Sequence, residues 1–284
     1  MHAFKYLLMD DIQRSLAEDI GSGDVSAGLL PADLAVTACI LSREPLLVCG
    51  RAWVDAVFAA VDSKIAIHWL VDEGAWLEKG QILCEIQGEA RSILTAERTA
   101  LNWLQTLSAT ATQTHHYVHA LRPYKTQLLD TRKTIPGLRV AQKYAVQCGG
   151  GVNHRMGLYD AFFIKENHIK ACGSITHAIR MAREAPTAGF VEVEVETLAE
   201  LREALAAKPD RILLDNFTVP MLAEAVAINT PKQCPLEASG GIDLATIHQI
   251  AALGLDYISV GAITKSINAI DLSLLIQDMP CLQK

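Results

Sequence analysis

The sequence predicts an α/β protein in which a mixed α/β region precedes a barrel of parallel strands. From residue 126 onward, short apolar runs alternate with helical stretches, and each run ends in a polar or glycine-rich turn. Such alternation requires crossover connections, which are right-handed and produce parallel sheets. The GxGxxG string that would end the first strand of an open dinucleotide-binding sheet is absent from the sequence. A barrel is therefore favoured over an open sheet.

Length and composition are those of a globular protein. The chain has 284 residues, of which 50% are hydrophobic and 20% charged, enough for one large domain or two modest ones. No stretch approaches the roughly 18 consecutive apolar residues of a membrane span, and the N-terminus lacks a signal-peptide pattern, so no membrane association is expected. Seven scattered cysteines without a CxxC pair predict reduced thiols in a cytoplasmic protein. A net charge of −7 argues against a nucleic-acid partner.

The first 121 residues predict helices and short strands in mixed order. A helix is expected over 4–18, before a loop dense in turn residues. Strands are expected over 34–41, 46–49 and 65–70, and a short-turned sheet over 72–83. Residues 89–121 form a helical pattern, because their leucines recur on common faces.

Six strands are expected in the second part of the chain, over 127–130, 161–164, 190–193, 211–214, 235–238 and 256–260. A charged residue or a glycine follows every one of them. In an α/β barrel the carboxyl ends of the strands converge on one face, where active sites are built. Six such endings in series are hard to explain by turn formation alone, so the sequence predicts an active site there.

The early strand ends are rich in cations. Residues 122–170 contain nine Lys or Arg against three acids, a charge of +6, so the rest of the chain carries −13. Arginine binds carboxylates and phosphates bidentately, and lysine supplies a movable point charge. The segment therefore predicts a site for a small, highly charged anion, with these candidate ligands: Arg132, Lys133, Arg139, Lys143, His154, Arg155 and Lys165.

The later strand ends carry acids and glycines. Glu192, Glu194 and Glu196 alternate along one strand and so share a face, and Asp215 ends the next strand. Such carboxylates can bind hydroxyls or a hydrated Mg²⁺. Ser239-Gly240-Gly241 and Gly261 are typical of phosphate-binding turns in barrels. Together these features predict a phosphorylated sugar and a second anionic reactant.

Four strings of residues have the form of a known family: 131–139 (TRKTIPGLR), 143–146 (KYAV), 149–158 (GGGVNHRMGL) and 164–169 (IKENHI). They resemble quinolinate phosphoribosyltransferase, and the likeness extends from residues 18–24 through 96–102 to 259–262. Three positions depart from the common pattern: Ser26 stands where Thr is common, Gly241 where Asn is frequent, and Lys265 where some members have His.

The resemblance implies a type II phosphoribosyltransferase fold. It implies an N-terminal α/β sandwich domain over 1–109 and an incomplete α/β barrel of six to seven strands over 110–271. The segment 272–284 is expected to return to the first domain. The implied reaction joins quinolinate and phosphoribosyl pyrophosphate, with Mg²⁺, to give nicotinate mononucleotide, pyrophosphate and CO2 in NAD synthesis.

The resemblance also implies a role for each site residue. Arg132, His154 and Arg155 would hold the carboxylates of quinolinate, and Arg98 would come from the neighbouring subunit of a homodimer, or of a hexamer. The residues with catalytic roles would be Lys133 and Lys165, between quinolinate and the phosphates, and Glu194 and Asp215, which face the ribose hydroxyls and hold Mg²⁺ indirectly. The 5′-phosphate would be received by Ser239, Gly240, Gly241, Val260 and Gly261.

Three alternatives remain open at the level of sequence. A phosphoribosyltransferase for another anionic base, such as nicotinate, would share the barrel but need fewer carboxylate ligands. An aldolase could form a Schiff base at Lys165, although that lysine lies among many cations. A non-catalytic anion-binding protein could share the fold, although acids and cations occur at every strand end.

Overall fold

The computed structural model describes residues 2–187 and 189–278, and the chain forms two compact units. The first unit comprises residues 1–113, 140–149 and 267–284, and the second, called here the barrel unit, comprises 114–139 and 150–266. The long helix α3 (Ala90–Leu121) contributes residues to both. None of the helices within the described residues is long and apolar enough to cross a membrane.

An antiparallel sheet of four strands, in the order β12-β1-β5-β3, forms the framework of the first unit. Its strands are β1 (Ala35–Ser42), β3 (Ala66–Trp69), β5 (Ile82–Glu89) and β12 (Leu272–Asp278). A separate ladder joins β2 (Leu46–Leu47) to β4 (Trp76–Leu77). Because β12 pairs with β1, the sheet combines residues from both ends of the sequence. The last part of the predicted returning segment, 279–284, lies outside the described residues.

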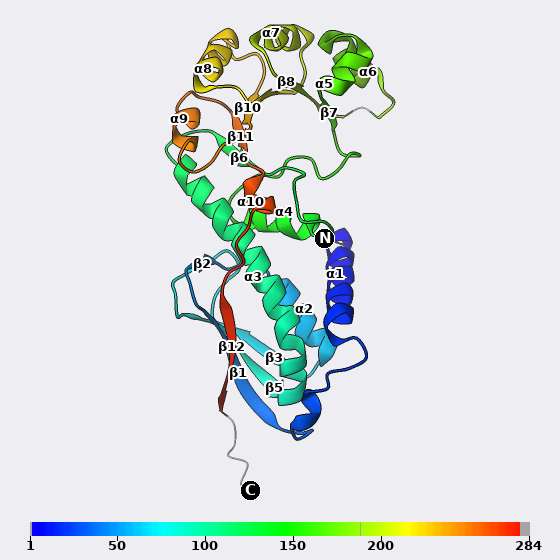
Figure 1. Cartoon of the computed structure of the whole chain (residues 1–284), viewed down its shortest axis with the longest axis vertical. Coiled ribbons are helices and arrows are strands. Elements are labelled where there is room, and N and C mark those ends of the chain that lie inside the picture. The colour runs from blue at the N-terminus through cyan, green and yellow to red at the C-terminus, as the bar shows by residue number, and fades with distance from the viewer. Residues whose placement is uncertain (1, 188, 279–284) are drawn as a thin grey trace. The chain divides into compact units, whose positions relative to one another are not determined.

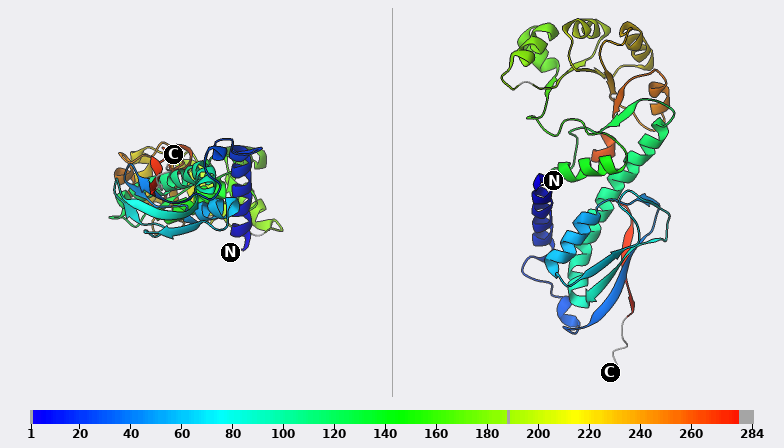
Figure 2. Two further views of the ribbon diagram at one scale, coloured as in Figure 1. Left: turned by 90° about the horizontal axis from the view of Figure 1, so that it is seen from below. Right: turned by 180° about the vertical axis from the view of Figure 1, so that it is seen from behind.

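Helices α1 (His2–Ile20), α2 (Arg51–Val61) and the first part of α3 pack together in this unit (Figure 2). The rings of Trp53 and Trp103 stack with centroids 6.0 Å apart, which joins α2 to α3. The Trp103 indole N–H donates to the Ser15 hydroxyl (2.9 Å) and so joins α1 to α3. A short 3-10 helix, η1 (Ala27–Leu29), lies between α1 and β1.

The N-terminus of α2 is capped by a residue that is distant in sequence. Glu73 Oε1 accepts from the Gly50 N–H (2.9 Å) and Glu73 Oε2 from the Arg51 N–H (3.2 Å). The Tyr144 hydroxyl, on α4 (Arg139–Cys148), also donates to Glu73 Oε1 (2.9 Å). A carboxylate at a helix N-terminus accepts hydrogen bonds from backbone N–H groups that have no partner within the helix, and its negative charge interacts favourably with the positive end of the helix dipole. Sequence reasoning did not identify α2, because its cap lies more than twenty residues away.

The barrel unit is built on a parallel sheet of six strands, in the order β6-β11-β10-β9-β8-β7 (Figure 1). The strands are β6 (Gln127–Leu129), β7 (Phe162–Ile164), β8 (Val191–Val195), β9 (Arg211–Asp215), β10 (Leu236–Ser239) and β11 (Tyr257–Ser259). All six predicted strands are therefore confirmed. Strands β6 and β7 are the edges of this sheet and do not pair with each other, so the barrel is incomplete.

Helices follow the strands, and most of them cover the convex face of the curved sheet (Figure 1). They are α5 (Glu166–Cys172), α6 (Ile175–Glu184), α7 (Leu198–Ala207), α8 (Val219–Ile228), α9 (Ile247–Ala251) and α10 (Ala262–Lys265). Ser174, Thr197 and Thr218 cap α6, α7 and α8 by accepting backbone N–H groups. These short polar side chains mark where each helix begins, and α7 and α8 begin shortly after the ends of β8 and β9.

Candidate active site

A cavity of about 570 Å³ lies at the carboxyl ends of the barrel strands. Its lining residues come from every strand end of the sheet, as the convergence of parallel strands requires. They are Thr131, Arg132, Lys133, His154, Arg155, Phe163, Lys165, Glu194, Leu213, Asp215, Asn216, Glu237, Ser239, Gly240, Gly241 and Ser259. The cavity thus combines five cations or histidines with three acids.

The guanidinium groups of Arg132 and Arg155 are available to an anionic ligand. The Arg132 Nε–H is buried and has no hydrogen-bond partner among the described residues. Arg155 Nη1 donates to the Ala161 carbonyl (3.3 Å), and its guanidinium lies over the Phe163 ring, 4.8 Å from the centroid. Burial and the nearby Arg132 both lower the pKa of Arg155. A carboxylate bound beside the two guanidinium groups would stabilise the charge of Arg155.

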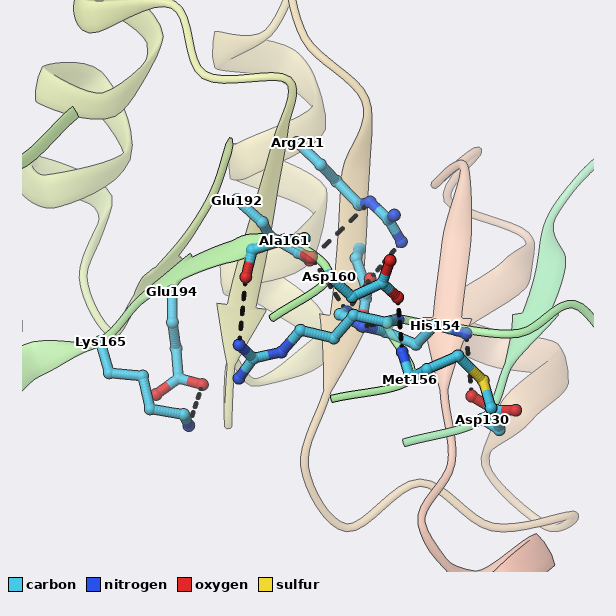
Figure 3. Close-up of polar contacts among 11 residues, drawn as sticks. Asp130, His154, Met156, Asp160, Ala161, Lys165, Glu192, Glu194 and Arg211 are labelled. Atoms are coloured by element: carbon cyan, nitrogen blue, oxygen red, sulfur yellow. Dashed lines mark hydrogen bonds and ion pairs between the residues drawn. The ribbon is translucent and has the colours of Figure 1, made fainter. Parts of the chain in front are cut away.

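Lys165 and Glu194 form an ion pair in the cavity, with Lys165 Nζ 2.7 Å from Glu194 Oε2 (Figure 3). Lys165 is the residue after β7, and Glu194 points inward from β8. Burial raises the pKa of the Glu194 carboxyl, although the Lys165 ammonium opposes this shift. Asp215 ends β9, and its Oδ2 accepts from the Asn216 side-chain amide (2.8 Å). The two carboxylates thus come from adjacent strands of the sheet.

The glycine turn after β10 fits closely against Asn216. A Cβ atom on Gly240 would lie 2.8 Å from Asn216 Cγ and 3.0 Å from its backbone nitrogen, and Gly240 has φ +105°. Gly241 also has positive φ, +61°, but open space surrounds the position of its Cβ. Gly240 is therefore required both by its backbone conformation and by close approach, and Gly241 by conformation alone.

Gly240→Ala is expected to destabilise the protein more than Gly241→Ala. Both variants strain a left-handed backbone, which costs about 1–3 kcal/mol each, but only the first must also displace Asn216. The free energy of unfolding in urea measures the difference. Equal values would show that Asn216 moves away at no cost.

A buried ionic layer of four side chains borders the cavity, and two of them, His154 and Glu237, belong to its wall. Most of the four are labelled in Figure 3. His154 Nε2 lies 2.9 Å from Glu192 Oε2 and 3.7 Å from Glu237 Oε2. Arg211 Nη1 lies 2.8 Å from Glu237 Oε2, and Arg211 Nε lies 3.8 Å from Glu192 Oε1. His154 Nδ1 accepts the Arg155 backbone N–H (2.7 Å), so both of its ring nitrogens face protein groups.

Comparison with known proteins agrees with this architecture. The family model for the N-terminal domain of quinolinate phosphoribosyl transferase matches residues 24–108, and the model for its C-terminal domain matches residues 110–275. The chain belongs to the quinolinate phosphoribosyltransferase family. This membership confirms the family, the fold class and the phosphoribosyltransferase activity that the sequence predicted.

Individual relatives match this family member over almost their whole length. The nicotinate-nucleotide pyrophosphorylase [carboxylating] of Mycobacterium leprae is 42% identical, over 93% of this chain and 95% of the relative. A probable enzyme of the same name from Bacillus subtilis is 41% identical, over 90% and 89%. The solved structure of the nicotinate-nucleotide pyrophosphorylase from Francisella tularensis has 49% identity and a TM-score of 0.93, and the match covers 95% of this chain and 96% of that one.

Ten of the residues to which the family resemblance gave roles line the cavity. They are Arg132, Lys133, His154, Arg155, Lys165, Glu194, Asp215, Ser239, Gly240 and Gly241. Three others do not. Val260 is buried and pairs with β6, Gly261 packs against the Lys133 side chain, and Arg98 belongs to the first unit, which does not contain the cavity.

Some residues singled out by pattern alone lie elsewhere. Arg139 donates to the carbonyls of Arg132 and Met156, so it ties two cavity loops together. Lys143 is fully buried in α4, within the first unit. Glu196 follows the end of β8 and is exposed, so only two of the three alternating glutamates point inward.

Six residues of the cavity wall were not predicted as site residues: Thr131, Phe163, Leu213, Asn216, Glu237 and Ser259. Phe163 supplies an aromatic face to both Arg155 and Lys165. Glu237 lies inside the predicted strand 235–238, and its acidity there was the signal that could have identified it, since an acid within an apolar strand is rarely buried without a partner.

Proposed function

We propose that this protein transfers the phosphoribosyl group of phosphoribosyl pyrophosphate to the ring nitrogen of quinolinate. The new nucleotide loses its 2-carboxyl group as CO2, and the products are nicotinate mononucleotide and pyrophosphate, in cytoplasmic NAD synthesis. The observation that carries the proposal is the composition of the cavity wall. Cationic groups beside Phe163 suit a flat dianionic ring, and the inward acids of β8 and β9 suit a sugar.

The quinolinate end of the cavity is cationic. Arg132 and Arg155 can each bind a carboxylate through a planar fork of N–H donors. Phe163, which lies beneath the Arg155 guanidinium, offers an apolar face for the ring. Nicotinate has one carboxylate and would leave one half-buried guanidinium without a carboxylate partner, which costs free energy. The wall therefore favours quinolinate over nicotinate.

The ribose end is acidic. Departure of pyrophosphate leaves positive charge on the anomeric carbon, so positioning and charge stabilisation contribute more than a nucleophilic side chain. Glu194 and Asp215 can accept hydrogen bonds from the ribose hydroxyls, and Lys133 can neutralise a phosphate oxygen. Ser239, Gly240 and Gly241 offer a turn for the 5′-phosphate.

Mg²⁺ fits this donor set. Glu194 and Asp215 present hard carboxylate oxygens on adjacent strands, the ligand type that Mg²⁺ prefers, and the ion usually keeps several waters. Glu194 is paired with Lys165, so we propose that both acids hold the ion through water. When bound, Mg²⁺ supplies positive charge that neutralises pyrophosphate.

We further propose that the active enzyme is a homodimer in which Arg98 completes the neighbouring site. The Arg98 side chain is 60% exposed, and its one ion pair among the described residues is a distant 3.8 Å contact with the adjacent Glu97. A largely exposed arginine is free to bind an anion on a partner subunit.

Product analysis tests the proposed reaction. With quinolinate, phosphoribosyl pyrophosphate and Mg²⁺, we expect one CO2 and one pyrophosphate per nicotinate mononucleotide. Nicotinate should be used far more slowly, and excess chelator should remove the activity. Nucleotide formed from carboxyl-labelled quinolinate without labelled CO2, or full activity in chelator, would contradict the proposal.

A further inference from the structure

The proposed reaction requires a proton that none of the roles above supplies. Loss of CO2 from the quinolinate nucleotide breaks the bond between ring carbon C2 and the carboxylate, and the electron pair remains on C2 beside the positively charged ring nitrogen. A proton must then reach C2 to complete nicotinate mononucleotide. The lysine and arginine side chains of the cavity are already assigned to the carboxylates and phosphates of the substrates, so another group must supply this proton.

Glu237 has the placement that such a donor needs. It lies on β10, lines the cavity and is 0% exposed. Its Oε2 contacts Arg211 Nη1 at 2.8 Å. Its Oε1 is buried as well, and the Ser259 hydroxyl, which also lines the cavity, interacts with this carboxyl group. Glu237 is therefore an acid in the wall that a bound substrate would face.

We propose that Glu237 is the general acid that protonates C2 after decarboxylation. This inference rests on the proposed function. The Glu237 O–H bond breaks, its proton forms the new C2–H bond with the electron pair left by CO2, and Glu237 becomes a carboxylate. Solvent returns one proton before the next turnover, so quinolinate mononucleotide and H⁺ give nicotinate mononucleotide and CO2.

The surroundings of Glu237 keep it protonated near neutral pH. Burial and the Glu192 carboxylate, which faces it from β8, raise the pKa of Glu237 to about 8. His154 from the loop before β7, Arg211 on β9 and the Ser259 hydroxyl on β11 oppose this shift without cancelling it. Two buried carboxyl groups this close cannot both ionise readily, so one proton is held at the cavity wall.

Glu237→Gln should separate the two halves of the reaction. Glutamine keeps the size and the contact with Arg211 but cannot give up a proton to C2. Pyrophosphate release in a single turnover should continue, whereas formation of nicotinate mononucleotide should fall by about 10²–10⁴-fold, the usual contribution of a general acid. Unprotonated carbanion can recapture CO2, so the carboxylated mononucleotide should accumulate and be visible by mass spectrometry after a rapid quench.

Glu192→Gln is the matched control. It changes the same buried layer, but Glu192 is not among the residues that line the cavity. Because the Glu192 carboxylate raises the pKa of Glu237, its loss should move the decline in CO2 release to lower pH, and at low pH this variant should form nicotinate mononucleotide without accumulating the intermediate. If Glu237 acted only by supporting the fold, both variants would slow pyrophosphate release and nucleotide formation together, and neither would accumulate the intermediate. That result would overturn the proposal.

The pH dependence of the wild-type enzyme provides a measurement that does not depend on a variant's folding. The protonated form of Glu237 is the active one, so CO2 release should decline as pH rises through about 8, while the pyrophosphate burst persists. If CO2 release and the pyrophosphate burst declined together, Glu237 would not be the proton donor. A wild-type enzyme that releases no pyrophosphate from quinolinate and phosphoribosyl pyrophosphate would instead refute the proposed function.

Discussion

Arg155→Ala is expected to lower kcat/KM for quinolinate by a few hundredfold while the protein stays folded. Arg155 is half-buried and lines the cavity beside Phe163 and Arg132, where it would pair with a carboxylate of quinolinate. Removing one partner of a buried charge pair costs about 2–5 kcal/mol. Steady-state kinetics measure the loss, and thermal unfolding checks the fold.

Two further variants make the Arg155 experiment specific. Arg155→Lys keeps the charge but loses the planar fork, so we expect an intermediate loss. Arg180→Ala removes an exposed arginine of α6 whose ion pair with Glu184 measures 4.0 Å, and its kinetics should match the wild type. Unchanged kinetics in Arg155→Ala would remove this arginine from the quinolinate site.

The barrel could be predicted strand by strand because its local signals agree. Each strand is a short apolar run, each is followed by turn residues, and three of the following helices begin at a Ser or Thr cap. The cap, the turn and the apolar run lie within a few residues of one another, so a short stretch of sequence is enough to predict each strand and the start of the helix after it. The cations and acids after the strands were predictable for the same reason.

Features that depend on distant residues could not be predicted. Helix α2 begins at a cap from Glu73, and no local Ser, Thr, Asp or Asn marks it. Spacing of i, i+4 places Arg139 and Lys143 on one face of α4 but does not say what that face contacts. Alternation along 192–196 predicts a shared face, yet β8 ends at Val195 and leaves Glu196 exposed.

Glu237 illustrates the same limit within the site. Its burial, its contact with Arg211 and its proximity to Glu192 arise from three neighbouring strands, β8, β9 and β10. Each of these strands is identified easily by itself, but their register decides which side chains meet. The chemistry of the cavity wall therefore emerges only when the strands are assembled.

Inactive Arg98→Ala and inactive Lys165→Ala are expected to restore activity when mixed. Lys165 lines the cavity of the barrel unit, whereas Arg98 belongs to the first unit. If Arg98 serves the neighbouring subunit of an isologous dimer, each site combines one chain's Lys165 with the partner's Arg98. A mixed dimer then has one site with both residues intact and one site that lacks both.

Subunit statistics set the size of the recovery. Equal amounts of the two variants, after full exchange, give mixed dimers as half of the population, and each has one functional site of two. Activity should therefore reach about a quarter of the wild-type value per site.

Mixing Arg98→Ala with Arg155→Ala should give the same recovery, because Arg155 also lines the barrel cavity. Mixing Lys165→Ala with Arg155→Ala should give none, since both defects lie in the same unit. If Arg98 instead served its own barrel, the first two mixtures would stay inactive despite demonstrated exchange.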